Sequence, residues 1–132
     1  MIFKNKKFER QVILNKETLD SILSYCQMKH PEECFLILKG KSKNGQIKVD
    51  GLVIPPFGFS EPTFGGIPQS FLPFDMSYVG SLRSHPVESA EPTIDDLNNF
   101  FGLVTIIVKS PYDEESIFAW DSGGESITLK LE

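Results

Sequence analysis

A continuous apolar run is the feature that most limits how this chain can fold. Residues 34–38 read Cys-Phe-Leu-Ile-Leu, a run of strand length with no polar face. Such a run is typical of a strand that is buried on both faces of a sheet. Asn44-Gly45 follows, the strongest short signal for a tight hairpin, and residues 46–54 would form the returning strand. The sequence therefore predicts that a sheet begins here.

Two helices are predicted, one before these two strands in the sequence and one after them. Asn15 is a good N-cap for a helix over residues 16–29, which Pro31 ends, and Thr93 starts a second helix over residues 94–101. The first helix would bury one face, formed by Leu19, Ile22, Leu23 and Cys26. The second would bury Leu97, Phe100 and Phe101, and Gly102 would stop it.

The remaining strands complete a single α/β domain. They are expected at residues 11–14, 76–84, 104–108, 116–120 and 127–131, the last two forming a hairpin around Gly123-Gly124. The sequence contains no repeat, linker or second domain. We therefore expect one domain over residues 1–132, with a curved, mostly antiparallel mixed sheet flanked by two main helices.

The composition argues against several classes of function. Apolar residues make up 40% of the chain and charged residues 23%, which is ordinary for a soluble globular domain. The formal net charge of −5 argues against nucleic-acid binding. No apolar stretch approaches the ~20 residues that span a bilayer, and none resembles a signal peptide. Cys26 and Cys34 are expected as free thiols. We therefore expect a cytoplasmic protein without nucleic-acid or membrane partners.

A long segment between the two halves of the chain is rich in proline, glycine and phenylalanine. It runs from Pro55 to Pro73 and has neither helical nor strand periodicity. Loops of this length are commonly functional. The phenylalanine-rich part, Phe57–Phe74, would either contact a protein partner or fold its aromatic rings against the sheet.

Three polar residues could meet at one point. His85 would end a strand, Asp96 would lie in the first turn of the second helix, and Glu33 would begin a neighbouring strand. An imidazole, a carboxylate and a second carboxylate acting through water are the parts of a zinc hydrolase site. Thr93-Ile94-Asp95-Asp96 also has the form of a capping box, which starts a helix and needs no catalysis. Both interpretations remain open from these residues.

Read as a whole, the pattern resembles the JAMM/MPN (JAB1/MPN/Mov34) metalloprotease-like domain, particularly its small archaeal members. The resemblance covers nearly the whole chain and rests on Pro31-Glu32-Glu33, an apolar strand ending in Gly40, Gly80-x-x-Arg83-Ser84-His85-Pro86 and Pro92-Thr93-x-x-Asp96-Leu97. It implies zinc as the cofactor and isopeptide bonds to ubiquitin or ubiquitin-like modifiers as the substrate. By position, Glu33 would be the general base, His85 and Asp96 the second and third zinc ligands, and Thr93 a hydroxyl donor where the family has serine.

Arg83 departs from the family pattern. It stands where the resemblance implies the first zinc-binding histidine, but a guanidinium stays protonated and has no lone pair to give to zinc. We therefore expect Arg83 to replace the charge of the metal, pairing with Asp96 or Glu33 as a bidentate ion pair. The alternative is an exposed arginine on a loop. His30, the other histidine, is a weak substitute because it lies at a helix end.

Two functions follow from the resemblance. The first is a family member with impaired or lost zinc catalysis, which acts as a binding module and could dimerise. The second is an active JAMM-type metallo-isopeptidase that uses an altered metal site or a ligand supplied by a partner. A nucleoside deaminase is disfavoured, because it needs His-x-Glu and Pro-Cys-x-x-Cys elements that this chain lacks.

Overall fold

The computed structural model of the chain describes residues 9–55 and 77–132. Its elements are β1 (Gln11–Leu14), α1 (Lys16–Lys29), β2 (Phe35–Lys43), β3 (Gln46–Val53), β4 (Tyr78–His85), α2 (Ile94–Asn98), β5 (Val104–Lys109), β6 (Ile117–Trp120) and β7 (Ser126–Leu131). The expected order of strands and helices is therefore confirmed. The expected contact loop, Phe57–Phe74, and the first residue of the strand expected at 76–84 lie outside the described residues.

The strands form one sheet that closes on itself. Its order is β1-β3-β2-β4-β5-β6-β7, and β7 pairs back with β1 to complete a barrel. β1 is parallel to β3 and β7, and β4 is parallel to β5, whereas the other neighbouring pairs are antiparallel. The expected curved, mostly antiparallel mixed sheet is confirmed, and the sequence did not predict its closure.

The central hairpin is longer than the apolar run suggested. β2 continues past Leu38 to Lys43, because its polar second half still pairs with β3 up to the turn. Asn44 and Gly45 have φ angles of 52° and 82°, as the predicted tight turn requires. The first half of β2, Phe35 to Leu38, is buried, in agreement with a strand covered on both faces.

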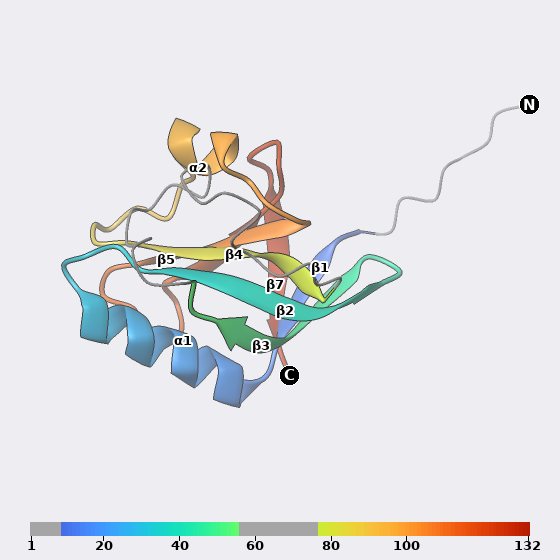
Figure 1. Cartoon of the computed structure of the whole chain (residues 1–132), viewed down its shortest axis with the longest axis horizontal. Helices are drawn as coiled ribbons and strands as arrows, with labels where there is room; N and C mark the ends of the chain where they lie inside the picture. The colour runs from blue at the N-terminus through green and yellow to red at the C-terminus, as the bar shows by residue number, and fades with distance from the viewer. Residues whose placement is uncertain (1–8, 56–76) are drawn as a thin grey trace, which may run out of the picture.

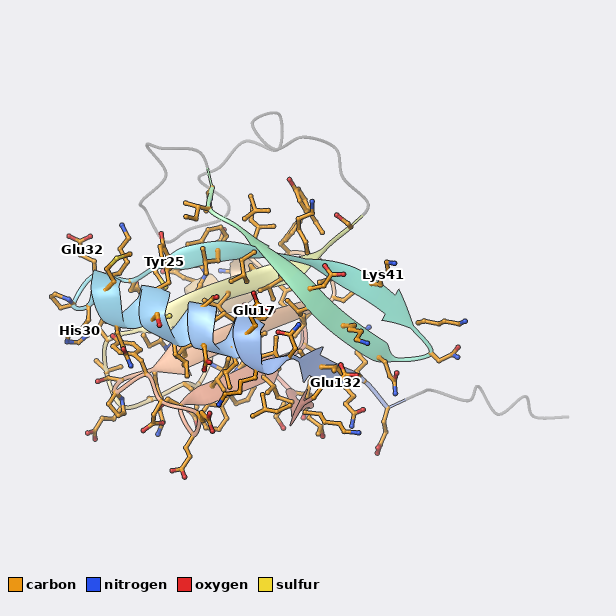
Figure 2. The ribbon with its side chains drawn as sticks, turned by 90° about the horizontal axis from the view of Figure 1, so that it is seen from below. Glu17, Tyr25, His30, Glu32, Lys41 and Glu132 are labelled. Atoms are coloured by element: carbon orange, nitrogen blue, oxygen red, sulfur yellow. The ribbon has the colours of Figure 1, made fainter. Side chains whose placement is uncertain are left out.

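The two helices lie on opposite sides of the sheet (Figure 1). The Asn15 side chain accepts a hydrogen bond from the Thr18 N–H at 2.7 Å, so the predicted N-cap is confirmed. α1 buries the predicted face formed by Leu19, Ile22, Leu23 and Cys26. Figure 2 shows α1 lying across the barrel. No helix of the described ranges is long and apolar enough to cross a membrane.

The second helix is shorter than predicted. α2 ends at Asn98, so Phe100 and Phe101 do not lie on its buried face. Asn99 is the C-cap: its backbone N–H makes the last helical hydrogen bond to the Asp95 carbonyl, and its side-chain amide donates to the same oxygen. Gly102 then adopts a φ of 74° and lies against the backbone of Val79, where a Cβ atom would be 2.6 Å from the Val79 oxygen. The chain therefore leaves α2 early to join the sheet beside β4.

Candidate functional site

Strand pairing brings the three predicted segments together at one end of the barrel. β2 and β4 are antiparallel, with Phe35 opposite Arg83, so the residues just before β2 lie beside the end of β4. A reciprocal pair of hydrogen bonds fixes this junction: the Ser84 N–H donates to the Cys34 carbonyl at 3.1 Å, and the Cys34 N–H donates to Ser84 Oγ at 2.7 Å. Because Cys34 is bonded to β4 in this way, its neighbour Glu33 lies near the end of β4, where His85 is located.

Asp96 is the centre of the site. Its Oδ2 atom lies 3.0 Å from His85 Nε2 and accepts a hydrogen bond from the Thr93 N–H at 2.8 Å. The Asp96 N–H in turn donates to Thr93 Oγ1 at 3.1 Å, which completes the capping box. Burial alone would raise the pKa of Asp96, but the hydrogen bonds from His85 and Thr93 outweigh burial and lower it. The helix start and the side-chain cluster thus use the same carboxylate.

Both ring nitrogens of His85 face oxygen atoms that can only accept hydrogen bonds. Nδ1 lies 3.1 Å from the Ser89 carbonyl oxygen, and Nε2 faces the carboxylate of Asp96. Burial favours the neutral imidazole, yet the hydrogen bond and the charge of Asp96 outweigh burial and raise the pKa of His85 above its ordinary value. The geometry therefore favours an imidazolium that donates from both nitrogens.

Arg83 is buried at the same site. Its residue exposure is 3%, and its Nε atom lies 3.6 Å from Asp96 Oδ1. The guanidinium stacks over the Phe35 ring, with Cζ 5.2 Å from the ring centroid. The expected pairing with Asp96 is thus observed, and the alternative of an exposed loop arginine is wrong. The expected bidentate arrangement is not found among the described residues: Nε lies 3.6 Å from Oδ1, which is too long for a hydrogen bond.

Glu33 is exposed at the site, in contrast to the buried cluster. Burial acts to lower the pKa of both Arg83 and His85, and the negative charge of Glu33 opposes this effect at both residues; the pKa of Arg83 is still lowered. The Glu33 carboxylate is therefore in contact with solvent, whereas Arg83, His85 and Asp96 are buried. The structure therefore brings Glu33, Arg83, His85 and Asp96 into one electrostatic cluster.

His30 belongs to a different part of the molecule. Its Nδ1 atom lies 2.6 Å from the hydroxyl of Tyr112, and the two rings meet edge to face. Figure 2 shows His30 and Glu32 at one end of α1, with Glu17 toward the other end. Because His30 has a hydrogen-bond partner in the turn after β5, we assign it a structural contact rather than a place in the cluster.

The sequence did not predict three contacts that support the site. Phe35 lies under the Arg83 guanidinium, Ser84 bonds to the backbone of Cys34, and Cys26 Sγ lies 3.3 Å from Cys34 Sγ as a pair of buried free thiols. All three depend on the register between β2 and β4 or on the packing of α1. An antiparallel alignment of the two predicted strands through Glu33 and His85 could have found Phe35 opposite Arg83.

The fold and the sequence both have relatives among known proteins. The chain is 32% identical over 125 residues to a protein of Haloferax volcanii described as a probable metalloprotease, and the match covers 88% of this chain and 77% of that protein. A JAB1/MPN domain protein from Archaeoglobus fulgidus is 30% identical, with a TM-score of 0.67 over 89% of this chain and 96% of that one. No protein-family model matches the sequence.

Two further solved structures share the fold. One, described as a metalloprotease-like JAMM zinc site in the proteasome and signalosome, has a TM-score of 0.68 at 27% identity over 92% of this chain and 98% of that one. A protein from Desulfitobacterium hafniense is 16% identical, with a TM-score of 0.64 over 92% of each chain. At that identity the second similarity concerns the fold alone.

The mixed barrel, with its His-Pro strand end beside a helix-capping aspartate, defines a metalloprotease-like domain. The chain belongs to the JAB1/MPN (JAMM) domain family of archaeal type. This agrees with the resemblance drawn from the sequence.

Zinc is the cofactor that the family implies, and the donor set of this chain does not fit it. A catalytic zinc ion normally has three protein ligands, but of the three positions at which the family pattern has zinc ligands, two carry a side chain that can bind zinc, His85 and Asp96. The described part of the chain contains no cluster of three His, Cys, Asp or Glu side chains able to hold a metal. Arg83 adds a fixed positive charge 3.6 Å from Asp96, which opposes a dication at the same carboxylate.

Proposed function

We propose that this JAMM/MPN domain has lost zinc-dependent hydrolysis and acts as a binding module. The buried ion pair between Arg83 and Asp96 supports this proposal most directly. In the family pattern Arg83 takes the position of the first zinc-binding histidine, and its charge balances the carboxylate that zinc would otherwise neutralise. Thr93 and Glu33, the hydroxyl and general base of that pattern, would then contact a ligand without cleaving it.

The proposed ligand is a ubiquitin-like modifier or its conjugate in the cytoplasm. This proposal rests on the family lineage, whose active members act on isopeptide bonds to such modifiers. The Phe57–Phe74 segment is the proposed contact for a protein partner, which could be a second copy of the chain.

Zinc content tests the proposed loss of the metal site. Elemental analysis of protein purified without a metal-binding tag should find far less than about one zinc per chain, because two ligands and a guanidinium hold zinc poorly. Arg83→His should raise the content to about one zinc per chain, since it restores a third nitrogen or oxygen ligand. Arg83→Gln is the matched control, because it removes the charge without adding a ligand. One zinc per chain in the unmodified protein would refute the proposal.

An active metallo-isopeptidase is the second candidate. Glu33 is exposed and its charge acts on His85, and the relative from Haloferax volcanii is described as a probable metalloprotease. This candidate requires an altered metal site or a ligand from a partner. It predicts cleavage of an isopeptide-linked modifier when zinc, manganese or cobalt is supplied, and loss of that cleavage in Glu33→Gln. Equal, background rates for both proteins in every metal would exclude it for the isolated chain.

A further inference from the structure

The two cysteines of the chain lie side by side in the core. Cys26 is on the buried face of α1 and Cys34 directly precedes β2, and their Sγ atoms are 3.3 Å apart. Both side chains are buried and both are free thiols. Within residues 9–55 and 77–132 the two thiols belong to no group of three His, Cys, Asp or Glu side chains able to hold a metal ion. The pair is therefore placed for a reaction between its own two sulfur atoms.

The surroundings of the two thiols separate their acidities. The hydrogen bond from Cys26 lowers the pKa of the Cys34 thiol to about 7, and Ser84 acts in the same direction, against the effect of burial. The same hydrogen bond, together with burial, raises the pKa of Cys26. Because the thiolate is the reactive form of cysteine, Cys34 is the nucleophile of the pair and Cys26 remains a thiol beside it.

An exposed turn leads to this pair. Residues 30–33 are all exposed at the end of α1, and the chain enters the core at Cys34 (Figure 2). Tyr112 covers the thiols from the side of the turn. Its hydroxyl lies 2.6 Å from His30 Nδ1, and it is close enough to both thiols that burial and their charges raise its pKa. Hydrogen peroxide is little larger than water, so a small opening of this turn would admit it to Cys34.

We propose that a hydroperoxide oxidises Cys26 and Cys34 to an intramolecular disulfide, which makes the candidate site sensitive to redox conditions. The Cys34 thiolate attacks the terminal oxygen of the peroxide, the O–O bond breaks, and the departing oxygen takes up a proton as water or an alcohol. Cys34 is then a sulfenic acid. The Cys26 sulfur attacks the Cys34 sulfur, the S–O bond breaks, and the released hydroxide takes the Cys26 proton as water. The two thiols lose two electrons, and the peroxide gains them.

The disulfide acts on residues that hold the candidate site. Its sulfur atoms must lie about 2.05 Å apart, so the Sγ atoms of Cys26 and Cys34 have to approach by about 1.3 Å. Cys34 is the neighbour of Glu33, and both its N–H and its carbonyl are bonded to Ser84, the neighbour of His85. The movement is therefore transmitted to the end of β4. This inference goes beyond the proposed function and needs neither a metal nor a bound ligand at His85.

The test treats the unmodified protein with hydrogen peroxide, unfolds it, alkylates free thiols with iodoacetamide and measures its mass. The oxidised chain should lose two hydrogen atoms, resist alkylation and recover both thiols with dithiothreitol. Trypsin cuts after Lys29, between the two cysteines, so residues 17–29 and 30–39 should stay joined until reduction. Cys26→Ser should stop at a sulfenic acid that dimedone traps on Cys34. Cys34→Ser should react about 10-fold more slowly, because the pKa of Cys26 is raised.

Transmission to the site is measured in the amide NMR spectrum of the oxidised protein. The Ser84 N–H signal should shift on oxidation, because its acceptor is the carbonyl of Cys34. The signal of Gly45, in the turn at the other end of β2, is the control and should stay in place. Dithiothreitol should restore the original spectrum.

Several results would overturn the inference. One is two free thiols after a treatment that oxidises glutathione completely at the same pH. Others are the addition of oxygen without a cross-link and a disulfide between two chains. Reaction of Cys34→Ser as fast as the unmodified protein would refute Cys34 as the nucleophile. An internal disulfide that leaves the Ser84 signal in place would refute the redox sensitivity of the site. None of these measurements involves zinc, so this inference and the proposed function fail separately.

Discussion

Replacement of Asp96 by asparagine tests whether the buried ion pair holds the site together. Asparagine keeps the shape of the side chain, and its amide oxygen can still accept the Thr93 N–H that caps α2. The substitution removes the negative charge that faces Arg83 at 3.6 Å and His85 at 3.0 Å. Its main effect is therefore to leave the buried Arg83 side chain without the negative charge of Asp96.

The expected cost follows from the burial of both partners. The side chains of Arg83 and Asp96 are each 4% exposed, so solvent screens the pair weakly. Breaking a buried pair by removing one charge typically costs about 3–5 kcal/mol of unfolding free energy. In an Arg83→Met background the guanidinium is absent, and Asp96→Asn then loses only its charge-assisted hydrogen bonds, about 1–2 kcal/mol. The cost of Asp96→Asn should thus be about 2–3 kcal/mol larger in the protein with Arg83 than in the Arg83→Met background.

Urea unfolding followed by the fluorescence of Trp120, the single tryptophan, measures these free energies. With a slope of about 2 kcal/mol per molar urea, Asp96→Asn should lower the midpoint by about 1.5–2.5 M in the Arg83 protein and by about 0.5–1 M in Arg83→Met. Equal shifts in the two backgrounds would refute the reasoning, since the cost would then come from the helix cap and His85 alone.

Two further predictions concern the sheet and the pH dependence of stability. Gly80→Ala should lower the free energy of unfolding by about 3 kcal/mol or more, because its Cβ would lie 2.0 Å from the Val104 carbonyl oxygen. Gly51→Ala is the control: the nearest atom to its Cβ would be 3.6 Å away, so it should cost less than about 1 kcal/mol. Similar urea midpoints for the two variants would contradict this prediction. The pKa of His85 is raised in the folded state. The contribution of protonated His85 to the free energy of unfolding is therefore complete below its unfolded pKa of about 6.5, and it is lost as the pH rises through the folded pKa. The pKa of Asp96 is lowered in the folded state. The stability that its carboxylate contributes is therefore present above about pH 4 and is lost as the pH falls through the folded pKa. The stability difference between the unmodified protein and His85→Gln should therefore be larger near pH 5 than at pH 8, and a larger difference at pH 8 would show that the imidazolium is not the stabilising form.

Local patterns in the sequence predicted most of the elements and failed where tertiary contacts intervened. The apolar run at residues 34–38, the Asn15 cap and the Asn44-Gly45 turn are local signals, and each is confirmed. α2 was predicted three residues too long, since its pattern of phenylalanines resembles a helical face. The chain instead turns at Gly102 because it must approach the backbone of β4, a neighbour that the local sequence does not identify.

For the site, the sequence by itself determined which chemical groups are available. It supplied an imidazole, two carboxylates, a hydroxyl and a guanidinium, and it fixed that Arg83 has no lone pair for a metal whatever its position. Only the tertiary structure decided that Arg83 is buried rather than exposed and that its Nε atom faces Asp96, while its Nη2 atom has no hydrogen-bond partner within residues 9–55 and 77–132. The physical reason is that burial and pairing depend on the register of β2 against β4 and on the start of α2, which are set by contacts between segments far apart in the chain.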